Sequence, residues 1–280
     1  MLFDEKALAF PCAGQWLVGV ATVPMQPGRR GVLVVVGGPQ YRAGSHRQFT
    51  LLARALAAQG IAAMRFDYRG MGDSDGEMRG FDDIGLDVRC AIDAFFAAVP
   101  GLQEVVLWGL CDGASAAALY AESDARVSAL VLLNPWVRTD EGLARSTLKH
   151  YYRERFLSPV LWKKIAQGRF DMRAAARSLV DILARASKPR QAGKTSGSEA
   201  LPERMHGALS RFDGKVLVVL SGADLTAREF ADTAAAPGWK GLLEAPRFTR
   251  HELARADHTF SRREWRDQVA AWTADWLHSW

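Results

Sequence analysis

The stretch VVLWGLCDGASAAA, residues 105–118, decides the fold. A short apolar run is followed by a tight Gly-Leu-Cys-Asp-Gly sequence and then by small helix-forming residues. This pattern predicts a strand, a sharp turn and a helix, and its G-x-C-x-G spacing matches the G-x-S-x-G turn that exposes a nucleophilic serine. Cys111 stands where that serine would be.

A nucleophile between a strand and a helix lies at the carboxyl edge of the sheet, where ligands of open α/β folds bind. Gly109 and Gly113 are expected to let the turn close, because a Cβ at either position would crowd the helix and the neighbouring strands. A helix N-terminus and a nearby imidazolium both favour a thiolate, so they lower the pKa of a cysteine from about 8.5. Cys111 is therefore the candidate nucleophile, and the alternative is an ordinary small buried residue.

Other candidate nucleophiles fit less well. Ser115 lies beyond the second glycine, inside the predicted helix, while Ser74 and Ser221 lack flanking glycines at the required spacing. Cys12 and Cys90 are expected to be buried structural residues. Three widely spaced cysteines predict neither a disulfide framework nor a Cys-x-x-Cys metal site.

Apolar runs recur along the chain on both sides of this stretch. They lie at 32–36, 61–66, 105–108, 129–133 and 216–220, and segments at 49–58, 84–96 and 114–121 have helical composition. Strands that alternate with helices imply parallel pairing, and continuous Val and Leu runs fit strands covered on both faces. Residues 7–23 predict an antiparallel hairpin at the edge of the sheet. The fold class is therefore α/β, with a mostly parallel central sheet flanked by helices.

The alternation of strands and helices stops after residue 136. The sequence that follows is Arg-rich and amphipathic, and SKPRQAGKTSGSEALP at 187–202 is rich in polar, Gly, Ser and Pro residues. We expect residues 137–210 to form a helical cap with a flexible segment at about 187–202. This cap is inserted into a core domain made of residues 1–136 and 211–280.

The composition is that of a globular chain, with 280 residues of which 49% are hydrophobic. The net charge of +5 is concentrated in residues 138–190, which hold 13 Lys and Arg against 5 Asp and Glu, so we expect no nucleic-acid partner. No stretch approaches the roughly 18 apolar residues that span a membrane. The first residues lack the pattern of a signal peptide, and we therefore expect a cytoplasmic protein.

The last part of the chain supplies an acid and a base in the order nucleophile, acid, histidine. In KVLVVLSGAD, residues 215–224, a strand ends in Ser-Gly-Ala-Asp, which puts Asp224 at its carboxyl end. In ELARADHTF, residues 252–260, His258 lies in a loop between a short strand and the final helix. We therefore predict a triad of Cys111, His258 and Asp224, and we expect Asp257 to have a surface or capping role.

An oxyanion needs two backbone donors, one from the residue after the nucleophile and one from the loop after the first central strand. The first is the N–H of Asp112. Because Pro39 has no N–H, the second is Gln40, which we prefer, or Gly38. The Asp112 carboxylate suits a helix N-terminus but opposes an adjacent thiolate, so the sequence leaves open whether it caps the helix or faces the substrate.

Several stretches resemble known proteins. RFDYRGMGDS, in which Asp67 and Arg69 are expected to hold the loop by ion pairs, and the cysteine turn resemble the α/β-hydrolase superfamily. Together, VVVGGPQYRAGSHRQF, VLWGLCDGASAA, LVLLNPWVRT, LKHYY, SGADLTAREF and ADHTFSRREWRD resemble the first type of exosortase A system-associated hydrolase, over nearly the whole chain. This resemblance implies a bacterial, cytosolic enzyme that is accessory to exosortase/PEP-CTERM sorting and exopolysaccharide synthesis. The turn is also similar to that of dienelactone hydrolases, but the predicted cap departs from their compact form.

These residues predict acyl transfer without a metal or cofactor. The Cys111 thiolate attacks a carbonyl carbon, and water or another acceptor then releases the acyl group from a thioester intermediate. Esters and thioesters are the expected substrates, because an amide has a poorer leaving group. The basic segment favours a small-molecule or carrier-linked acyl substrate that carries an anionic group. The alternative is that this segment is a solvent-exposed helical face rich in arginine and has no role in binding. The alternatives are an acyltransferase with the same triad and a non-catalytic scaffold in which Cys111 is inert or a redox sensor.

Overall fold

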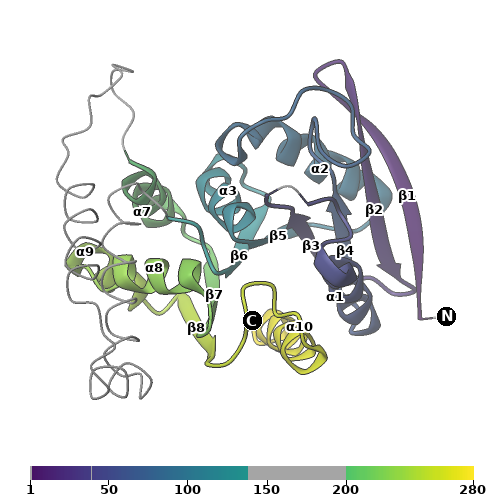
Figure 1. Cartoon of the computed structure of the whole chain (residues 1–280). Helices are drawn as coiled ribbons and strands as arrows, with labels where there is room; N and C mark the ends of the chain where they lie inside the picture. The colour runs from purple at the N-terminus through teal and green to yellow at the C-terminus, as the bar shows by residue number, and fades with distance from the viewer. Residues whose placement is uncertain (1, 39, 138–199) are drawn as a thin grey trace, which may run out of the picture. The chain divides into compact units, whose positions relative to one another are not determined.

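The computed structural model describes residues 2–38, 40–137 and 200–280 (Figure 1). The chain divides into two units, of which one joins Met1–Val137 to Pro202–Trp280 and the other is Arg138–Leu201. The predicted cap and its predicted flexible segment therefore lie almost entirely outside the described residues, and both stay predictions. The helix α7 (Leu201–Arg211) begins before residue 211, where the sequence predicts that the core resumes.

Within the described residues, eight strands form one sheet in the order β1-β2-β4-β3-β5-β6-β7-β8. Their bounds are β1 (Phe3–Cys12), β2 (Gln15–Pro24), β3 (Arg30–Val35), β4 (Ala62–Phe66), β5 (Glu104–Leu110), β6 (Val127–Leu133), β7 (Lys215–Ser221) and β8 (Phe248–Leu253). The pairs β1 with β2 and β2 with β4 are antiparallel, and the other neighbours are parallel. The predicted α/β fold is confirmed, and so is the edge hairpin, whose turn residues Ala13 and Gly14 have φ of 51° and 79°.

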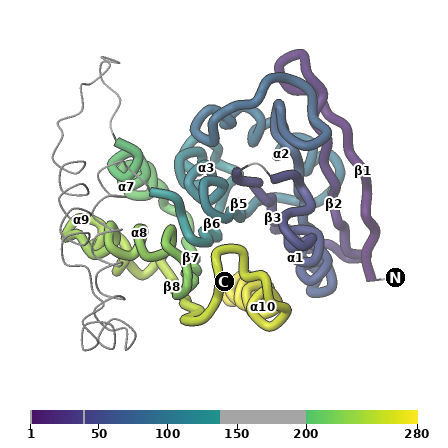
Figure 2. Tube along the Cα trace, in the orientation of Figure 1, coloured from purple at the N-terminus to yellow at the C-terminus, as the bar shows by residue number. Residues whose placement is uncertain are grey.

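Helices cover both faces of this sheet (Figures 1 and 2). On one face α1 (Gln48–Ala58) packs against α10 (Arg263–His278), and on the other α2 (Gly85–Ala98) lies beside α3 (Asp112–Tyr120). The helices α8 (Leu225–Ala234) and α9 (Pro237–Leu243) follow β7, and short 3-10 turns lie at Ser45–Arg47, Phe81–Asp83 and Ala121–Ser123. The helices predicted at 49–58, 84–96 and 114–121 are thus confirmed, with ends that differ by a few residues.

The central strands are apolar along their length because both of their faces are buried. In β3, Val32 and Val34 belong to the core that also contains Leu56 of α1 and Trp276 of α10. Leu33 and Val35 are also fully buried, and they point to the opposite face, since side chains alternate along a strand. β5 lies in the middle of this covered sheet, between β3 and β6, so the residue that follows it is fixed at the centre of the carboxyl edge.

Buried carboxylates hold the loop after β4, as the sequence predicts. Asp67 is fully buried and accepts hydrogen bonds from the backbone N–H of Arg42, at 2.6 Å, and from its guanidinium. Arg69 donates its backbone N–H, its Nε–H and its Nη2–H to Asp87 at 2.9, 2.8 and 2.7 Å. Since Asp87 is fully buried on α2, this ion pair joins the loop to the helix layer.

The Arg69–Asp87 pair should matter for stability. Asp87→Ala is expected to lower the free energy of unfolding by about 3–5 kcal/mol, because the Arg69 guanidinium would stay buried without its carboxylate. Urea denaturation measures the change. The matched control is Asp93→Ala on the same helix, whose ion pair with Arg126 is largely exposed and should contribute less than about 1 kcal/mol. Equal losses in the two variants would contradict the prediction.

Candidate active site

The turn at residues 109–113, here called the elbow, carries Cys111 between β5 and α3. Cys111 has φ of 60° and ψ of −125°, a conformation that residues with a side chain rarely adopt. Its N–H donates to the carbonyl oxygen of Leu133 at 2.9 Å, and its own carbonyl accepts from the Trp136 N–H at 3.2 Å. The end of β6 and the segment that follows it therefore hold the elbow in this conformation.

Gly109 and Gly113 permit the elbow to close, as the sequence predicts. An ideal Cβ on Gly109 would lie 2.4 Å from the backbone carbonyl carbon of Gly113. A Cβ on Gly113 would lie 2.4 Å from the carbonyl oxygen of Val35. Because backbone atoms make both contacts, any side chain at these positions would push α3 away from the sheet.

Asp224 and His258 meet at the same edge of the sheet. Asp224 follows β7, and His258 lies in the segment between β8 and α10. The His258 Nδ1 is 2.9 Å from the Asp224 Oδ2. That same oxygen accepts the Ala227 N–H at 2.9 Å, so Asp224 is also the N-cap of α8. The helix cap thus fixes the carboxylate in the orientation that contacts the histidine.

The protonation of His258 depends on both of its neighbours. The pKa of His258 is raised from 6.5 to about 10, because the Asp224 carboxylate accepts a hydrogen bond from the ring and the Cys111 sulfur interacts with it as well. Burial acts to raise the pKa of Asp224, but the hydrogen bond from His258, the charge of that ring and the backbone N–H groups at the start of α8 together outweigh it and leave that pKa lowered. His258 is therefore an imidazolium at neutral pH, in contact with an anionic carboxylate and with Cys111.

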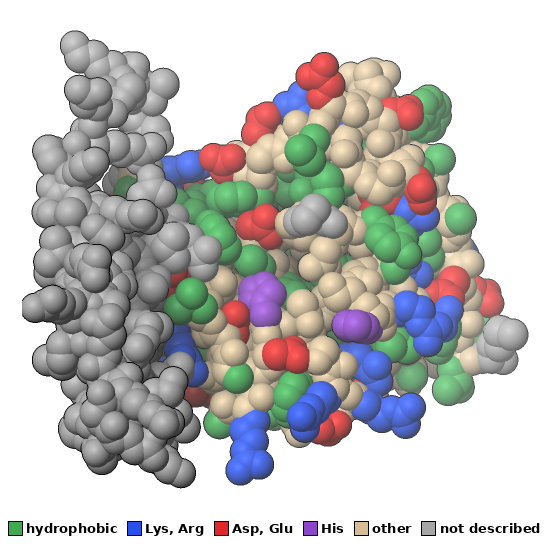
Figure 3. All heavy atoms as spheres, viewed as in Figure 1, with side chains coloured by type: hydrophobic (Ala, Val, Ile, Leu, Met, Phe, Trp, Pro, Cys, Tyr) green, Lys and Arg blue, Asp and Glu red, His purple; other side chains and the backbone are tan. Residues whose placement is uncertain are grey.

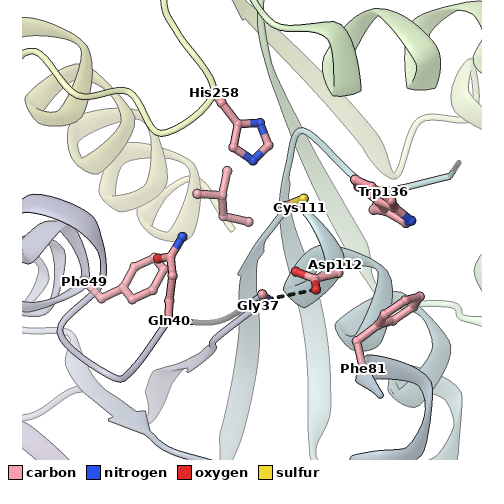
Figure 4. Close-up of a pocket in the computed structure, with 10 residues that line it drawn as sticks. Gly37, Gln40, Phe49, Phe81, Cys111, Asp112, Trp136 and His258 are labelled. Atoms are coloured by element: carbon pink, nitrogen blue, oxygen red, sulfur yellow. Dashed lines mark hydrogen bonds between the residues drawn. The ribbon is translucent and has the colours of Figure 1, made fainter. Parts of the chain in front are cut away.

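A cavity of about 390 Å³ opens in front of the elbow (Figure 4). Its described lining residues are Gly37, Gly38, Gln40, Phe49, Phe81, Leu110, Cys111, Asp112, Trp136 and His258. Figure 4 shows the Cys111 sulfur and the His258 ring facing the same space. The cavity is thus mostly apolar, with the thiol, the imidazole and the Asp112 carboxylate as its chemically active groups.

The backbone donors predicted for an oxyanion border this cavity. The Gly38 N–H donates to the Asp112 Oδ2 at 2.8 Å (Figure 4). The Gly113 N–H donates to the Asp112 Oδ1 at 3.0 Å. The Asp112 carboxylate therefore accepts a bond from the second residue of α3 and also lines the cavity. Burial raises the pKa of Asp112, although these N–H groups act in the opposite direction.

Asn134, at the end of β6, is a site residue that sequence reasoning missed. It is fully buried with φ of 43°. Its Nδ2 donates to the Ser221 Oγ at 2.8 Å and to the His258 carbonyl oxygen at 2.9 Å, and its Oδ1 accepts the Ser221 N–H at 2.9 Å. Asn134 therefore joins β6, β7 and the histidine loop. The only sequence feature that points to it is its position in Leu-Asn-Pro, directly after an apolar strand.

Because Asn134 holds the histidine loop, its loss should misplace His258, the predicted base. Asn134→Ala is expected to lower kcat on the order of 10²-fold, the cost of a displacement of about 1 Å in a catalytic group. Steady-state kinetics on an activated ester, with the pH profile of kcat, measures the effect. The control is Ser221→Ala, which removes one of these bonds and leaves the contact with His258 intact. An unchanged kcat in Asn134→Ala would contradict the positioning role.

The residues expected to lie outside the site do so. Asp257 accepts the Ser261 N–H at 2.9 Å, as a local cap. Cys12 is buried as expected, whereas Cys90 is half-buried.

Among the described residues, no group of three or more His, Cys, Asp or Glu side chains could hold a metal ion. None of the described helices is long and apolar enough to cross a bilayer.

Solved structures share this fold. The Pyrococcus furiosus esterase Pf2001 is 13% identical with a TM-score of 0.67, and the alignment covers 99% of this chain and 92% of that one. Est1E from Butyrivibrio proteoclasticus, with ferulic acid bound, is 15% identical with a TM-score of 0.64 and 98% of both chains covered. A dienelactone hydrolase from Anabaena variabilis is 16% identical with a TM-score of 0.62, over 100% of this chain and 99% of that one. Identities this low show the fold alone.

One curated relative matches a shorter stretch. The polyketide transferase grgF of a Penicillium species is 33% identical over 90 residues. The match covers 31% of this chain and 31% of that protein. The chain therefore matches about a third of the length of this relative.

A family model matches more than half of the chain, at residues 28–196. This range contains the loop after β3, the elbow and the end of β6. The family, Hydrolase_4, is described as serine aminopeptidase, S33, whereas the elbow of this chain carries Cys111. The chain therefore belongs to the serine aminopeptidase S33 family of hydrolases.

Proposed function

We propose that this chain is a cysteine hydrolase that cleaves an ester or thioester through a covalent acyl-enzyme on Cys111. The observation that carries the proposal is the contact of His258 with both Cys111 and Asp224 at a cavity in front of the elbow. This is the geometry that acyl transfer requires: a nucleophile, a base beside it, and an acid that orients the base.

In the acylation step, the Cys111 thiolate attacks the carbonyl carbon, and a bond forms between Sγ and that carbon. The His258 imidazolium then gives its proton to the departing alcohol or thiol as the bond to the leaving group breaks. The backbone N–H groups of Gln40 and Asp112, with Gly38 as the alternative to Gln40, are proposed to stabilise the oxyanion. Because His258 has a pKa of about 10, it carries the required proton at neutral pH.

In the second step, a water molecule attacks the thioester. Once Cys111 is acylated, the sulfur no longer supports the positive charge of His258, so the pKa of His258 falls from about 10. The neutral ring then takes a proton from the attacking water, the carbon–sulfur bond breaks, and the thiolate returns with the carboxylic acid as product. Asp224 holds the ring through Nδ1 in both steps.

The cavity and the surface charges support a small-molecule or carrier-linked acyl substrate. Phe49, Phe81, Leu110 and Trp136 line the cavity and suit an acyl chain. Figure 3 shows acidic and basic side chains interspersed over the described residues of one face, unlike a nucleic-acid-binding stripe. We further propose that the basic segment at 138–190, part of the expected cap, binds an anionic handle. The exosortase-associated motifs add the proposal of a bacterial, cytoplasmic accessory enzyme.

Trapping the intermediate tests this function. The protein is mixed with p-nitrophenyl esters and with acyl-CoA thioesters of several chain lengths, quenched in acid and examined by mass spectrometry. The expected result is one acyl group on the peptide that contains Cys111, and its loss on treatment with neutral hydroxylamine. Turnover without acylation of this peptide would overturn the proposal.

Alkylation gives a second test, which requires no substrate. Since the pKa of His258 is raised, the ring stays positive through neutral pH and loses its charge only as the pH rises through about 10. This positive charge lies beside the Cys111 sulfur and should speed its alkylation, so at pH 6.5 iodoacetamide should modify Cys111 roughly ten times faster in the parent than in His258→Ala. Equal rates across the pH range would favour a non-catalytic scaffold.

An acyltransferase with the same triad is the second candidate, and the partial match to a polyketide transferase favours keeping it. In that case an alcohol or amine replaces water in the second step. Product analysis with and without an added acceptor separates the two activities. Hydrolysis that is unaffected by any acceptor supports the hydrolase.

A further inference from the structure

The side chain of Asp112 lies in the candidate active site and not on the outer surface of α3. Its Oδ2 accepts the Gly38 N–H at 2.8 Å, and its Oδ1 accepts the Gly113 N–H at 3.0 Å. Gly38 is one of the two N–H groups that the loop after β3 can offer to an oxyanion. The N–H of Asp112 itself, the other donor expected for an oxyanion, also interacts with this carboxylate. Donors suited to a substrate oxyanion therefore face an anion that belongs to the protein.

The fit between the carboxylate and the loop is close. An ideal Cβ on Gly37 would lie 2.1 Å from the Asp112 Oδ1 and 2.4 Å from the Gly113 nitrogen. The carboxylate therefore packs directly against the backbone of Gly37, where only a glycine leaves room for it. Charge-assisted bonds from backbone N–H groups at a helix N-terminus are the interactions that bind an oxyanion in acyl-transfer enzymes.

We propose that the Asp112 carboxylate occupies the anion-binding site of the free protein, and that Gly38, the alternative to Gln40, is the loop donor to the oxyanion. Acyl transfer then requires release of the carboxylate from the Gly38 N–H. The proposal rests on the function proposed above, since it concerns the oxyanion of that reaction. While the carboxylate is in place, the developing oxyanion meets a negative charge and lacks a donor. The fraction of molecules that can react is therefore the fraction in which the Asp112 carboxylate has left the Gly38 N–H.

Protonation of Asp112 should weaken this occupancy, because the neutral acid forms weaker bonds with the N–H groups. The other titratable groups that interact with it are His258 in the loop after β8 and Tyr68 after β4, and Cys111 lines the same cavity. Burial raises the pKa of Asp112, so the anion that blocks the site is present above this raised pKa and disappears below it. The effect of removing the carboxylate should therefore grow as the pH rises.

The test compares the parent with Asp112→Ala and Asp112→Asn, using p-nitrophenyl acetate from pH 4 to pH 9. Loss of one oxyanion donor costs about 10²–10³-fold in kcat, so freeing the Gly38 N–H should raise kcat/KM on the order of 10²-fold in Asp112→Ala at pH 8. Asp112→Asn should give a smaller gain, because its amide oxygen still accepts a neutral bond. As the pH falls below the pKa of Asp112, the parent carries a neutral acceptor as Asp112→Asn does. The Asp112→Asn ratio to the parent should therefore approach one, and the Asp112→Ala ratio should fall towards the ratio between the two variants. The control is Asp257→Asn, which removes a carboxylate next to His258 in the chain and should leave the rate unchanged.

A binding measurement makes the test independent of turnover. Benzoate, which carries the carboxylate of a reaction product, should bind Asp112→Ala at least tenfold more tightly than the parent in calorimetry, because the anion site is vacant. If both variants fold, yet react more slowly than the parent and bind benzoate no better, the carboxylate supports the loop and the proposal is wrong. If p-nitrophenol release does not depend on Cys111 in any variant, the proposed hydrolase function fails, whereas the benzoate result still decides the occupancy of the anion site.

Discussion

Cys111→Ala is expected to lower kcat/KM for p-nitrophenyl esters and acyl-CoA thioesters by at least about 10⁴-fold, the range seen when a nucleophile is removed from a catalytic triad. Asp224 and His258 cannot compensate for the loss, because the described lining residues of the cavity include no thiol or hydroxyl other than Cys111. Steady-state rates for both substrate classes measure the loss. Urea denaturation should show that the variant is folded, since alanine only removes the sulfur.

The matched control for this variant is Cys90→Ala. Cys90 is a half-buried free cysteine on α2, away from the elbow, so its removal should leave both rates unchanged. Iodoacetamide should inactivate Cys90→Ala as fast as it inactivates the parent. Residual activity in Cys111→Ala above about a hundredth of the parent value would mean that another group is the nucleophile.

Asp224→Asn is expected to lower kcat about 10⁴-fold while leaving the protein folded. Asparagine caps a helix as well as aspartate does, so the bond from the Ala227 N–H can persist and α8 keeps its first turn. An uncharged amide, however, no longer stabilises the imidazolium, and it favours the wrong tautomer of His258. The pKa of His258 should therefore fall from about 10, which the pH profile of kcat detects.

The comparison for this variant is Asp257→Asn, the same change at the carboxylate adjacent to His258 in sequence. It removes a local bond to Ser261 and should change kcat by less than about twofold, because surface substitutions have small effects. Similar losses in the two variants would show that the charge near the loop matters and the contact with Nδ1 does not.

Much of the fold could be predicted because the residues that determine each strand and helix are close together in the sequence. The Val and Leu runs of β3, β5, β6 and β7 are continuous since both faces of each strand are buried, and this pattern is visible in the sequence. The elbow could be predicted because its G-x-C-x-G spacing is visible in the sequence, and the contact that requires Gly109 comes from Gly113, four residues away. The contact that requires Gly113 comes from Val35 in the neighbouring strand, and the sequence alone does not show it. Asp224 and His258 could be chosen by their order after the strands.

Features that depend on contacts between distant segments could not be predicted. Asn134 contacts residues 87 and 124 positions away in the chain, and no local pattern specifies such a bridge. The bond from the Gly38 N–H to Asp112 spans 74 positions and decides which way that carboxylate points.

The sequence analysis does not predict the helices α8 and α9, although both have local start signals. Asp224 is the N-cap of α8, and Pro237 is the first residue of α9.

The backbone at Cys111 has a thermodynamic consequence for the whole chain. A residue with a side chain at φ of 60° and ψ of −125° lies in a sparsely populated region, which costs on the order of 1–3 kcal/mol. Glycine would adopt these angles without strain and would leave the molecule harder to unfold, yet it would offer nothing to an acyl group. The free energy of unfolding of the chain is therefore lower than that of the same fold with glycine at this position. The difference is the strain that is needed to present the Cys111 sulfur at the elbow.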